Sequence, residues 1–78
     1  MCNYRTDTVA LKKIMIDNNI DTITELSEAS GVDRNTLSKI LSGKMQPSSG
    51  AMVKIAFALN MPPEVAGRIF FTPNLRNT

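Results

Sequence analysis

Histidine is absent from the sequence, and cysteine occurs only once, as Cys2. A single cysteine excludes an internal disulfide, and the absence of histidine excludes a zinc site of the usual Cys/His type. We interpret Cys2 as an ordinary free thiol, which suits a reducing cytosol. The sequence therefore predicts no metal ion and no other cofactor.

Long hydrophobic runs are also missing. No apolar stretch approaches the roughly 20 residues that a membrane span needs, and the N-terminus lacks the apolar core of a signal peptide. We therefore expect a soluble cytoplasmic protein that makes no membrane contact. With no histidine, no glycine-rich phosphate loop and only scattered carboxylates, the chain offers no pairing of nucleophile and base, which argues against an enzyme. No small-molecule ligand is predicted.

Acidic residues are missing from one part of the chain. Six of them lie between Asp7 and Asp33, but the segment from Arg34 to Pro63 has none. The same segment contains the basic residues Arg34, Lys39, Lys44 and Lys54. Four basic residues could simply form a solvated face. Because acids are excluded so completely, although the net charge is only +2, we favour a surface that faces phosphates.

The 78 residues are expected to form one domain, whose small core depends on well-packed helices. Hydrophobic spacing predicts an all-α fold of five helices and no convincing strand. Residues 1–5 are expected to form a loose arm, and the tail at about 72–78 is expected to fray. The helices should run from a Thr6 or Asp7 cap to Asp17, over about 23–30 and 34–42, from a Ser48 or Ser49 cap to Asn60, and from Pro62–Pro63 to Thr72–Pro73.

The predicted core consists of the apolar residues that recur at helical spacing. They are Val9, Leu11, Ile14 and Met15, then Ile23, Leu26 and Ala29, then Val32, Leu37, Ile40 and Leu41, then Met52, Ile55, Ala56 and Leu59, and finally Val65, Ile69 and Phe70.

Residues 22–43 are the most informative stretch, because they predict two short helices joined by a tight turn. Thr22 and Glu25 have the spacing of a capping box at the start of the first helix. Gly31 stands where a short turn tends to require positive φ, which glycine adopts easily. Asp33 is placed to cap the second helix, and Gly43 to end it.

This register resembles the helix-turn-helix family of phage Cro and cI repressors, over about half of the chain from Thr22 to Leu59. The resemblance implies a compact five-helix, lambda-repressor-like DNA-binding domain. Its helix-turn-helix core would be residues 22–43, with the second helix placed in the major groove of double-stranded DNA. The matching positions are Leu26, Ser27, Gly31–Val32, Thr36, Leu37, Ser38, Gly43, Pro47–Ser48, Ile55–Ala56 and Leu59.

Base contacts are expected from the outward residues of the second helix. By helical spacing and by the family's pattern these are Arg34, Asn35, Ser38 and Lys39. Arginine and lysine can donate to guanine O6 and N7, and asparagine can pair with adenine N6 and N7. The alternative is that they are ordinary solvated residues.

Phosphate contacts are expected from the start of the first helix and from the loop after the second. The predicted residues are Thr22, Thr24, Thr36, Ser42, Gly43, Lys44 and Gln46, with Lys54 as a further contributor. One position departs from the family, where the residue at Ile23 is commonly glutamine. Isoleucine cannot clamp the DNA backbone, so Thr22 and Thr24 would have to substitute in part.

Phe70 and Phe71 are adjacent, so one helical face cannot bury both well. Ile69, Phe71 and Leu75 could therefore form an apolar patch that joins two copies into a homodimer, in free solution or only on DNA. The alternative is that Phe71 folds back over the core.

The resemblance implies a transcriptional regulator from a phage, prophage or other mobile element. A domain this small could act as a repressor by blocking polymerase sterically. The rival hypothesis is an antitoxin-like or regulatory partner protein that uses the same fold, and its C-terminal hydrophobic residues, to bind another protein.

Overall fold

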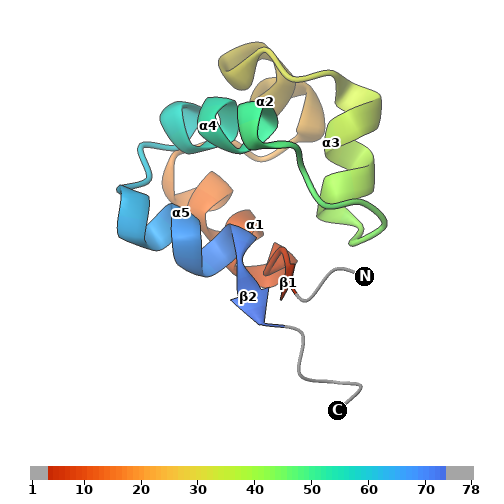
Figure 1. The fold of residues 1–78 in the computed structure, drawn as a ribbon. Helices are drawn as coiled ribbons and strands as arrows, with labels where there is room; N and C mark the ends of the chain where they lie inside the picture. The colour runs from red at the N-terminus through yellow and green to blue at the C-terminus, as the bar shows by residue number, and fades with distance from the viewer. Residues whose placement is uncertain (1–3, 74–78) are drawn as a thin grey trace.

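The computed structural model describes residues 4–73, and within this range the chain forms five helices and two short strands (Figure 1). Helix α1 packs against α3 and α5, α2 packs against α3 and α4, and α4 packs against α5. The predicted all-α, five-helix fold is therefore confirmed. In chain order the elements are β1 (Tyr4–Arg5), α1 (Thr8–Asp17), α2 (Ile23–Ser30), α3 (Arg34–Leu41), α4 (Ser49–Ala58), α5 (Pro63–Phe70) and β2 (Thr72–Pro73).

Each of the first four helices begins at a residue whose side chain accepts a backbone N–H of the first turn. These caps are Asp7, Thr22, Asp33 and Ser48. Such caps satisfy N–H groups that have no partner inside the helix. Helix α5 has no side-chain cap and begins instead at Pro63, whose fixed φ suits a first helical position. The predicted helix starts are thus confirmed.

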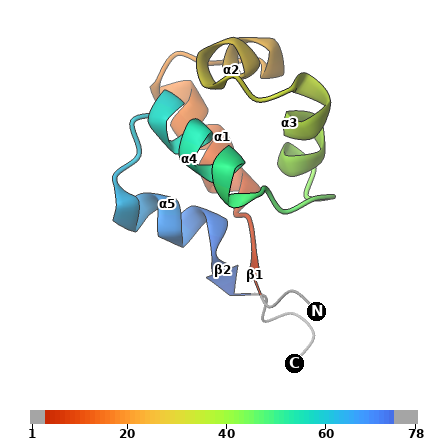
Figure 2. The same ribbon diagram turned by 45° about the horizontal axis from the view of Figure 1, so that its top comes forward.

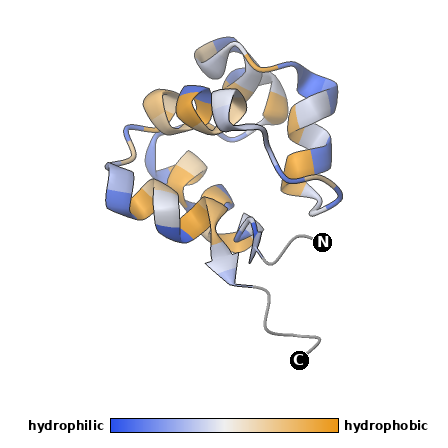
Figure 3. Cartoon of the chain, in the orientation of Figure 1, coloured by the Kyte–Doolittle hydropathy of each residue, from blue (hydrophilic) through white to orange (hydrophobic). Residues whose placement is uncertain are grey.

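The core lies where the inner sides of the helices meet, and in Figure 3 each helix carries both hydrophobic and hydrophilic residues. The prediction was wrong for Val9, which is 66% exposed, and for Ala29, which is also exposed. At about 100° per residue, Val9 lies on the opposite side of α1 from Leu11. The buried apolar residues are Leu11, Met15, Leu26, Val32, Leu37, Ile40, Leu41, Ala51, Ile55, Leu59, Ile69 and Phe70.

The two ends of the described chain are joined by a short antiparallel pairing of β1 with β2. Tyr4 lies opposite Pro73, and Arg5 lies opposite Thr72. Figures 1 and 2 both show the two strands side by side below α5. The prediction of a loose N-terminal arm and of no strand was wrong for these residues, because two-residue strands leave no periodic signal. Residues 74–78 of the predicted tail lie outside the described part.

A buried polar contact reinforces this pairing. Thr6 is only 6% exposed, and its Oγ1 donates to Oε1 of Gln46 at 2.9 Å. Nε2 of Gln46 in turn donates to the backbone oxygen of Phe70. The backbone N–H of Asp7 donates to the oxygen of Ile69 at 2.8 Å. The segment before α1 is therefore fastened both to the loop after α3 and to the end of α5.

Candidate nucleic-acid interface

The start of α2 is fastened by the predicted capping box. The backbone N–H of Glu25 donates to Oγ1 of Thr22 at 3.1 Å. Oε1 of Glu25 accepts from the backbone N–H groups of Thr22 at 3.1 Å and of Asp21 at 2.8 Å. Ile23, which follows the cap, is half-buried and packs against the core. Its packing role agrees with the departure from glutamine noted in the sequence.

The turn between α2 and α3 has one conformation that local bonds hold in place. Gly31 has φ of 78°, the left-handed region that glycine adopts at little cost. Oγ of Ser27 donates to the backbone oxygen of Val32 at 2.7 Å, and Val32 itself is 7% exposed. The N–H of Val32 donates to Oγ of Ser30 at 3.1 Å. These contacts set the direction in which α3 leaves α2.

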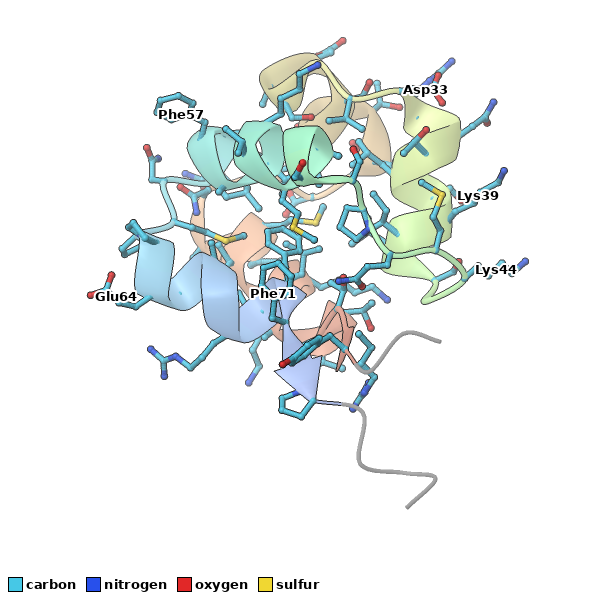
Figure 4. All side chains as sticks on the ribbon, viewed as in Figure 1. Asp33, Lys39, Lys44, Phe57, Glu64 and Phe71 are labelled. Carbon is cyan, nitrogen blue, oxygen red and sulfur yellow. The ribbon has the colours of Figure 1, made fainter. Side chains whose placement is uncertain are left out.

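Helix α3 turns one side into the core and leaves the other side open. Leu37 and Ile40 are completely buried, and Leu41 is 7% exposed. The four predicted base-contacting residues are all on the exposed side, and none of their side chains bonds another described residue. In Figure 4, Lys39 extends away from the body of the molecule. The exposed residues are Arg34, Asn35, Ser38 and Lys39.

The end of α3 is shaped by Gly43, whose φ is 81°. The N–H of Gly43 donates to the oxygen of Ile40 at 3.1 Å, and the N–H of Lys44 donates to that of Lys39 at 2.9 Å. This pair of bonds is the Schellman arrangement that ends many helices. It leaves the side chain of Lys44 exposed, on the same side of the molecule as Lys39 (Figure 4).

The predicted phosphate-contacting residues do not all keep a free donor. The hydroxyls of Thr22 and Thr36 are each bonded to a carboxylate, of Glu25 and Asp33 respectively. The backbone N–H of Gly43 is already bonded to the oxygen of Ile40 in α3. Among the described residues, Thr24 and Lys44 are exposed and their side chains make no bond to another residue.

Gln46 and Ser42 differ in whether their side chains can still reach a phosphate. Both polar atoms of the Gln46 amide are already hydrogen-bonded, the oxygen to Thr6 and the nitrogen to Phe70. The structure therefore gives Gln46 a structural role in place of the predicted phosphate contact. Ser42 is exposed and its Oγ donates to the backbone oxygen of Lys39 at 3.1 Å.

The residues predicted to join two copies are corrected in part. Ile69 is only 4% exposed, so it cannot belong to a surface patch. Phe70 is buried, whereas Phe71 is 49% exposed and lies edge-on to Tyr4, with ring centroids 5.9 Å apart. Leu75 lies outside the described residues.

An apolar surface lies between α4 and α5. The predicted dimer residue Phe71 lines it, but sequence reasoning missed the contribution of α4. An open hollow of about 480 Å³ is lined there by Met52, Ala56 and Phe70 among others. At its edge Phe57 is 83% exposed and Val53 is 61% exposed. Figure 4 shows Phe57 projecting from the end of α4. Both residues are apolar but fall outside the predicted buried stripe of this helix. That mismatch was the sequence signal that could have indicated an exposed apolar surface.

Within residues 4–73, no group of three histidine, cysteine, aspartate or glutamate residues is placed to hold a metal ion. None of the helices in that range has the length and apolar character needed to cross a membrane.

Comparison with known proteins gives a family. A family profile for the Cro/C1-type helix-turn-helix DNA-binding domain matches residues 10–64, which is more than half of the 78 residues. No curated protein and no solved structure matches the chain. The matched segment contains α2, the turn at Gly31 and α3, whose geometry is described above. The chain therefore belongs to the Cro/C1-type helix-turn-helix family of DNA-binding domains.

Proposed function

We propose that the protein is a sequence-specific transcriptional regulator that inserts α3 into the major groove of double-stranded DNA. The observation that carries the proposal is the two-sided character of α3. Leu37 and Ile40 anchor one side in the core, while the other side presents unbonded polar residues. In this kind of docking, the N-terminal residues of the second helix contact the base edges.

The chemistry of the exposed side suits base recognition. Arg34 and Lys39 donate to guanine O6 and N7, and Asn35 pairs with adenine N6 and N7. Ser38 adds a hydroxyl that can donate or accept. Because α3 is anchored by three buried side chains and by caps at both ends, the backbone that carries these groups is held in place before DNA binds.

Phosphate contacts are proposed for Thr24 at the start of α2 and for Lys44 after the end of α3, both of which have uncommitted side chains. Ser42 joins them, because its hydroxyl can rotate to a phosphate oxygen. Thr22, Thr36 and Gly43 act mainly by holding the helix ends in place. Lys54, exposed on α4, adds to the positive field.

Repression is the mode of regulation that we propose, because a small domain bound at a promoter blocks polymerase sterically. An origin in a phage, prophage or other mobile element, and action in the bacterial cytoplasm, follow from the kinship with Cro and cI repressors. The family match supports DNA binding itself, and these finer attributions are proposals.

We further propose that two copies form a homodimer through the surface between α4 and α5. The exposed ring of Phe57 and the hollow beside it lie on the same face. A two-fold axis needs a self-complementary surface of this kind, in which each copy offers a projection and a recess. A dimer would then contact two half-sites about one helical turn apart. The alternative is that a different protein covers this surface, as it would if this chain were an antitoxin-like or regulatory partner protein.

Selection of bound sequences from a random pool of duplex DNA tests the function. We expect one enriched motif, and binding that weakens steeply with salt because counterions are released. Lys44→Ala should weaken binding to all sequences alike and flatten the salt slope by about one unit.

Lys13→Ala is the matched control, since Lys13 is exposed on α1 and lines a hollow with α5 residues away from α3. It should leave the slope unchanged. If no sequence is enriched and the protein shows no DNA affinity at moderate salt, the proposal is wrong and the protein-partner hypothesis takes its place.

A further inference from the structure

A second basic group lies beside Lys44, although it is distant in the sequence. Strand β1 and the turn after α3 line a common hollow of about 370 Å³. Arg5 contributes to it from β1, and Ser42 and Lys44 contribute from the turn. Thr8, the first residue of α1, completes the rim.

The hollow is basic, because Arg5 and Lys44 line it and no acidic residue is among the described residues that do so. The nearest carboxylate in the sequence, that of Asp7, lines a different hollow beside α5. Its Oδ1 also accepts the N–H of Ala10 at 3.1 Å. Arg5 and Lys44 are both exposed, and neither side chain bonds another described residue.

We propose that this hollow binds one phosphate of the DNA backbone between Arg5 and Lys44, which makes β1 a DNA-binding element. The inference rests on the proposed function and adds a residue to it. Arginine presents a planar fork that contacts two phosphate oxygens, whereas lysine supplies a compact charge. Thr8, at the start of α1, adds a hydroxyl to the rim that can donate to a phosphate oxygen.

The position of Arg5 is fixed in advance by contacts outside the hollow. Arg5 itself pairs with Thr72 in the strand ladder. The next residue, Thr6, is buried and bonded to Gln46. Because the backbone of β1 is ordered before binding, little backbone conformational entropy is lost when the phosphate arrives.

The hollow also lies where a DNA strand would pass. The N-terminal residues of α3 approach the bases, so the C-terminal end of α3 and the turn after it approach the backbone. Lys39 and Lys44 extend to the same side of the molecule in Figure 4. Strand β1 lies near this turn in Figures 1 and 2, so its arginine extends the basic surface along the backbone.

The first test compares Arg5→Ala with Arg68→Ala, an exposed arginine on α5 that does not line the hollow. Binding to the selected DNA is measured as a function of salt. Arg5→Ala should weaken binding about tenfold at low salt, as expected for a lost charge-assisted contact. It should also lower the salt slope by about one unit, equally for matched and mismatched sequences. Arg68→Ala should change neither.

The second test replaces single phosphates of the DNA by uncharged methylphosphonates. At one phosphate position, the methylphosphonate should weaken binding of the wild type but should hardly weaken binding of Arg5→Ala or Lys44→Ala any further. The reason is that the two side chains would share that phosphate. Thermal midpoints of the variants should equal that of the wild type.

If Arg5→Ala behaves like Arg68→Ala, or if the two variants respond to different phosphates, the shared site is wrong while the proposed function stands. If the wild type binds no DNA, both are wrong. These outcomes separate the two proposals.

Discussion

At the residue scale, the side chains of α3 divide into those that hold the helix and those that face outward. Leu37 and Ile40 have no exposed surface. Arg34 and Asn35, in the first turn, contribute nothing to the core. Because the two groups lie on different sides of one short helix, changes in each should affect different properties, either the free energy of unfolding or the choice of DNA sequence.

Leu37→Ala should destabilise the fold by roughly 2–5 kcal/mol, the usual cost of truncating a buried leucine. The loss combines the transfer of apolar surface with the cavity that remains, and in a domain of 78 residues it could unfold the chain. Thermal or urea unfolding measures the change. Ile16→Ala on α1, at 62% exposure, is the control and should cost far less. An unchanged midpoint for Leu37→Ala would show that α3 is anchored differently.

Arg34→Ala and Asn35→Ala should have the opposite profile. Stability should change by less than about 0.5 kcal/mol, as for most surface substitutions. Discrimination should relax at one or two base pairs per half-site, each by roughly 1–3 kcal/mol. A base-substitution scan of the selected DNA against wild type and both variants measures this. Should both variants keep the full base preference of the wild type, α3 does not recognise the bases.

At the scale of the element, the helix-turn-helix depends on backbone conformation as much as on side chains. Gly31 and Gly43 both have positive φ, with values of 78° and 81°. The first sets the angle between α2 and α3, and the second ends α3 so that Lys44 is presented beside it. An added Cβ would meet no atom within 4 Å at either position, so the restriction comes from the backbone alone.

Gly43→Ala should therefore destabilise the protein by about 1–2 kcal/mol, the cost of a left-handed conformation for a residue with a Cβ. Gly67→Ala is the matched control, because Gly67 lies inside α5 with ordinary helical φ and open space around it. That substitution should stabilise the helix by about 0.5–1 kcal/mol. Chemical unfolding of both variants gives the comparison. Equal effects of the same sign would contradict the argument.

At the scale of the whole molecule, the apolar surface between α4 and α5 leaves large apolar side chains in contact with solvent. Phe57 exposes 83% of its surface there, beside an apolar hollow. Solvent contact of a large ring is unfavourable, so association that covers it is favoured. In Figure 1, α3 lies on the right of the molecule and α5 on the left. In the proposed dimer, a second copy that covers the surface between α4 and α5 would therefore leave α3 free to contact DNA.

Phe57→Ser should shift the protein toward monomer, and it should reduce cooperative binding to DNA with two half-sites more than binding to a single half-site. Sedimentation over a range of concentrations and titrations of both DNAs measure these effects. Val9→Ser on α1, another exposed apolar side chain at 66%, is the control and should change neither. A wild-type protein that stays monomeric at high concentration and binds two half-sites independently would contradict the dimer.

The sequence alone determined the helices, their caps and the outward face of α3. Those features depend on residues within about four positions of one another, such as Thr22 with Glu25 or Asp33 with Thr36. Periodic spacing likewise identified Leu37 and Ile40 as core residues. Local physics therefore sufficed for the outward face of α3, on which base contacts are proposed, and the register of the whole unit was enough to indicate the family.

Only the tertiary structure decided contacts between distant parts of the chain. The pairing of Tyr4–Arg5 with Thr72–Pro73, and the bond from Thr6 to Gln46, join segments that carry no pattern of their own. Helical spacing placed Phe70 in the predicted core, and only the structure excluded the alternative that Phe71 folds back over that core. Which of two adjacent rings faces inward depends on how α5 packs against its neighbours. The same packing, and no local pattern, places Arg5 beside Lys44.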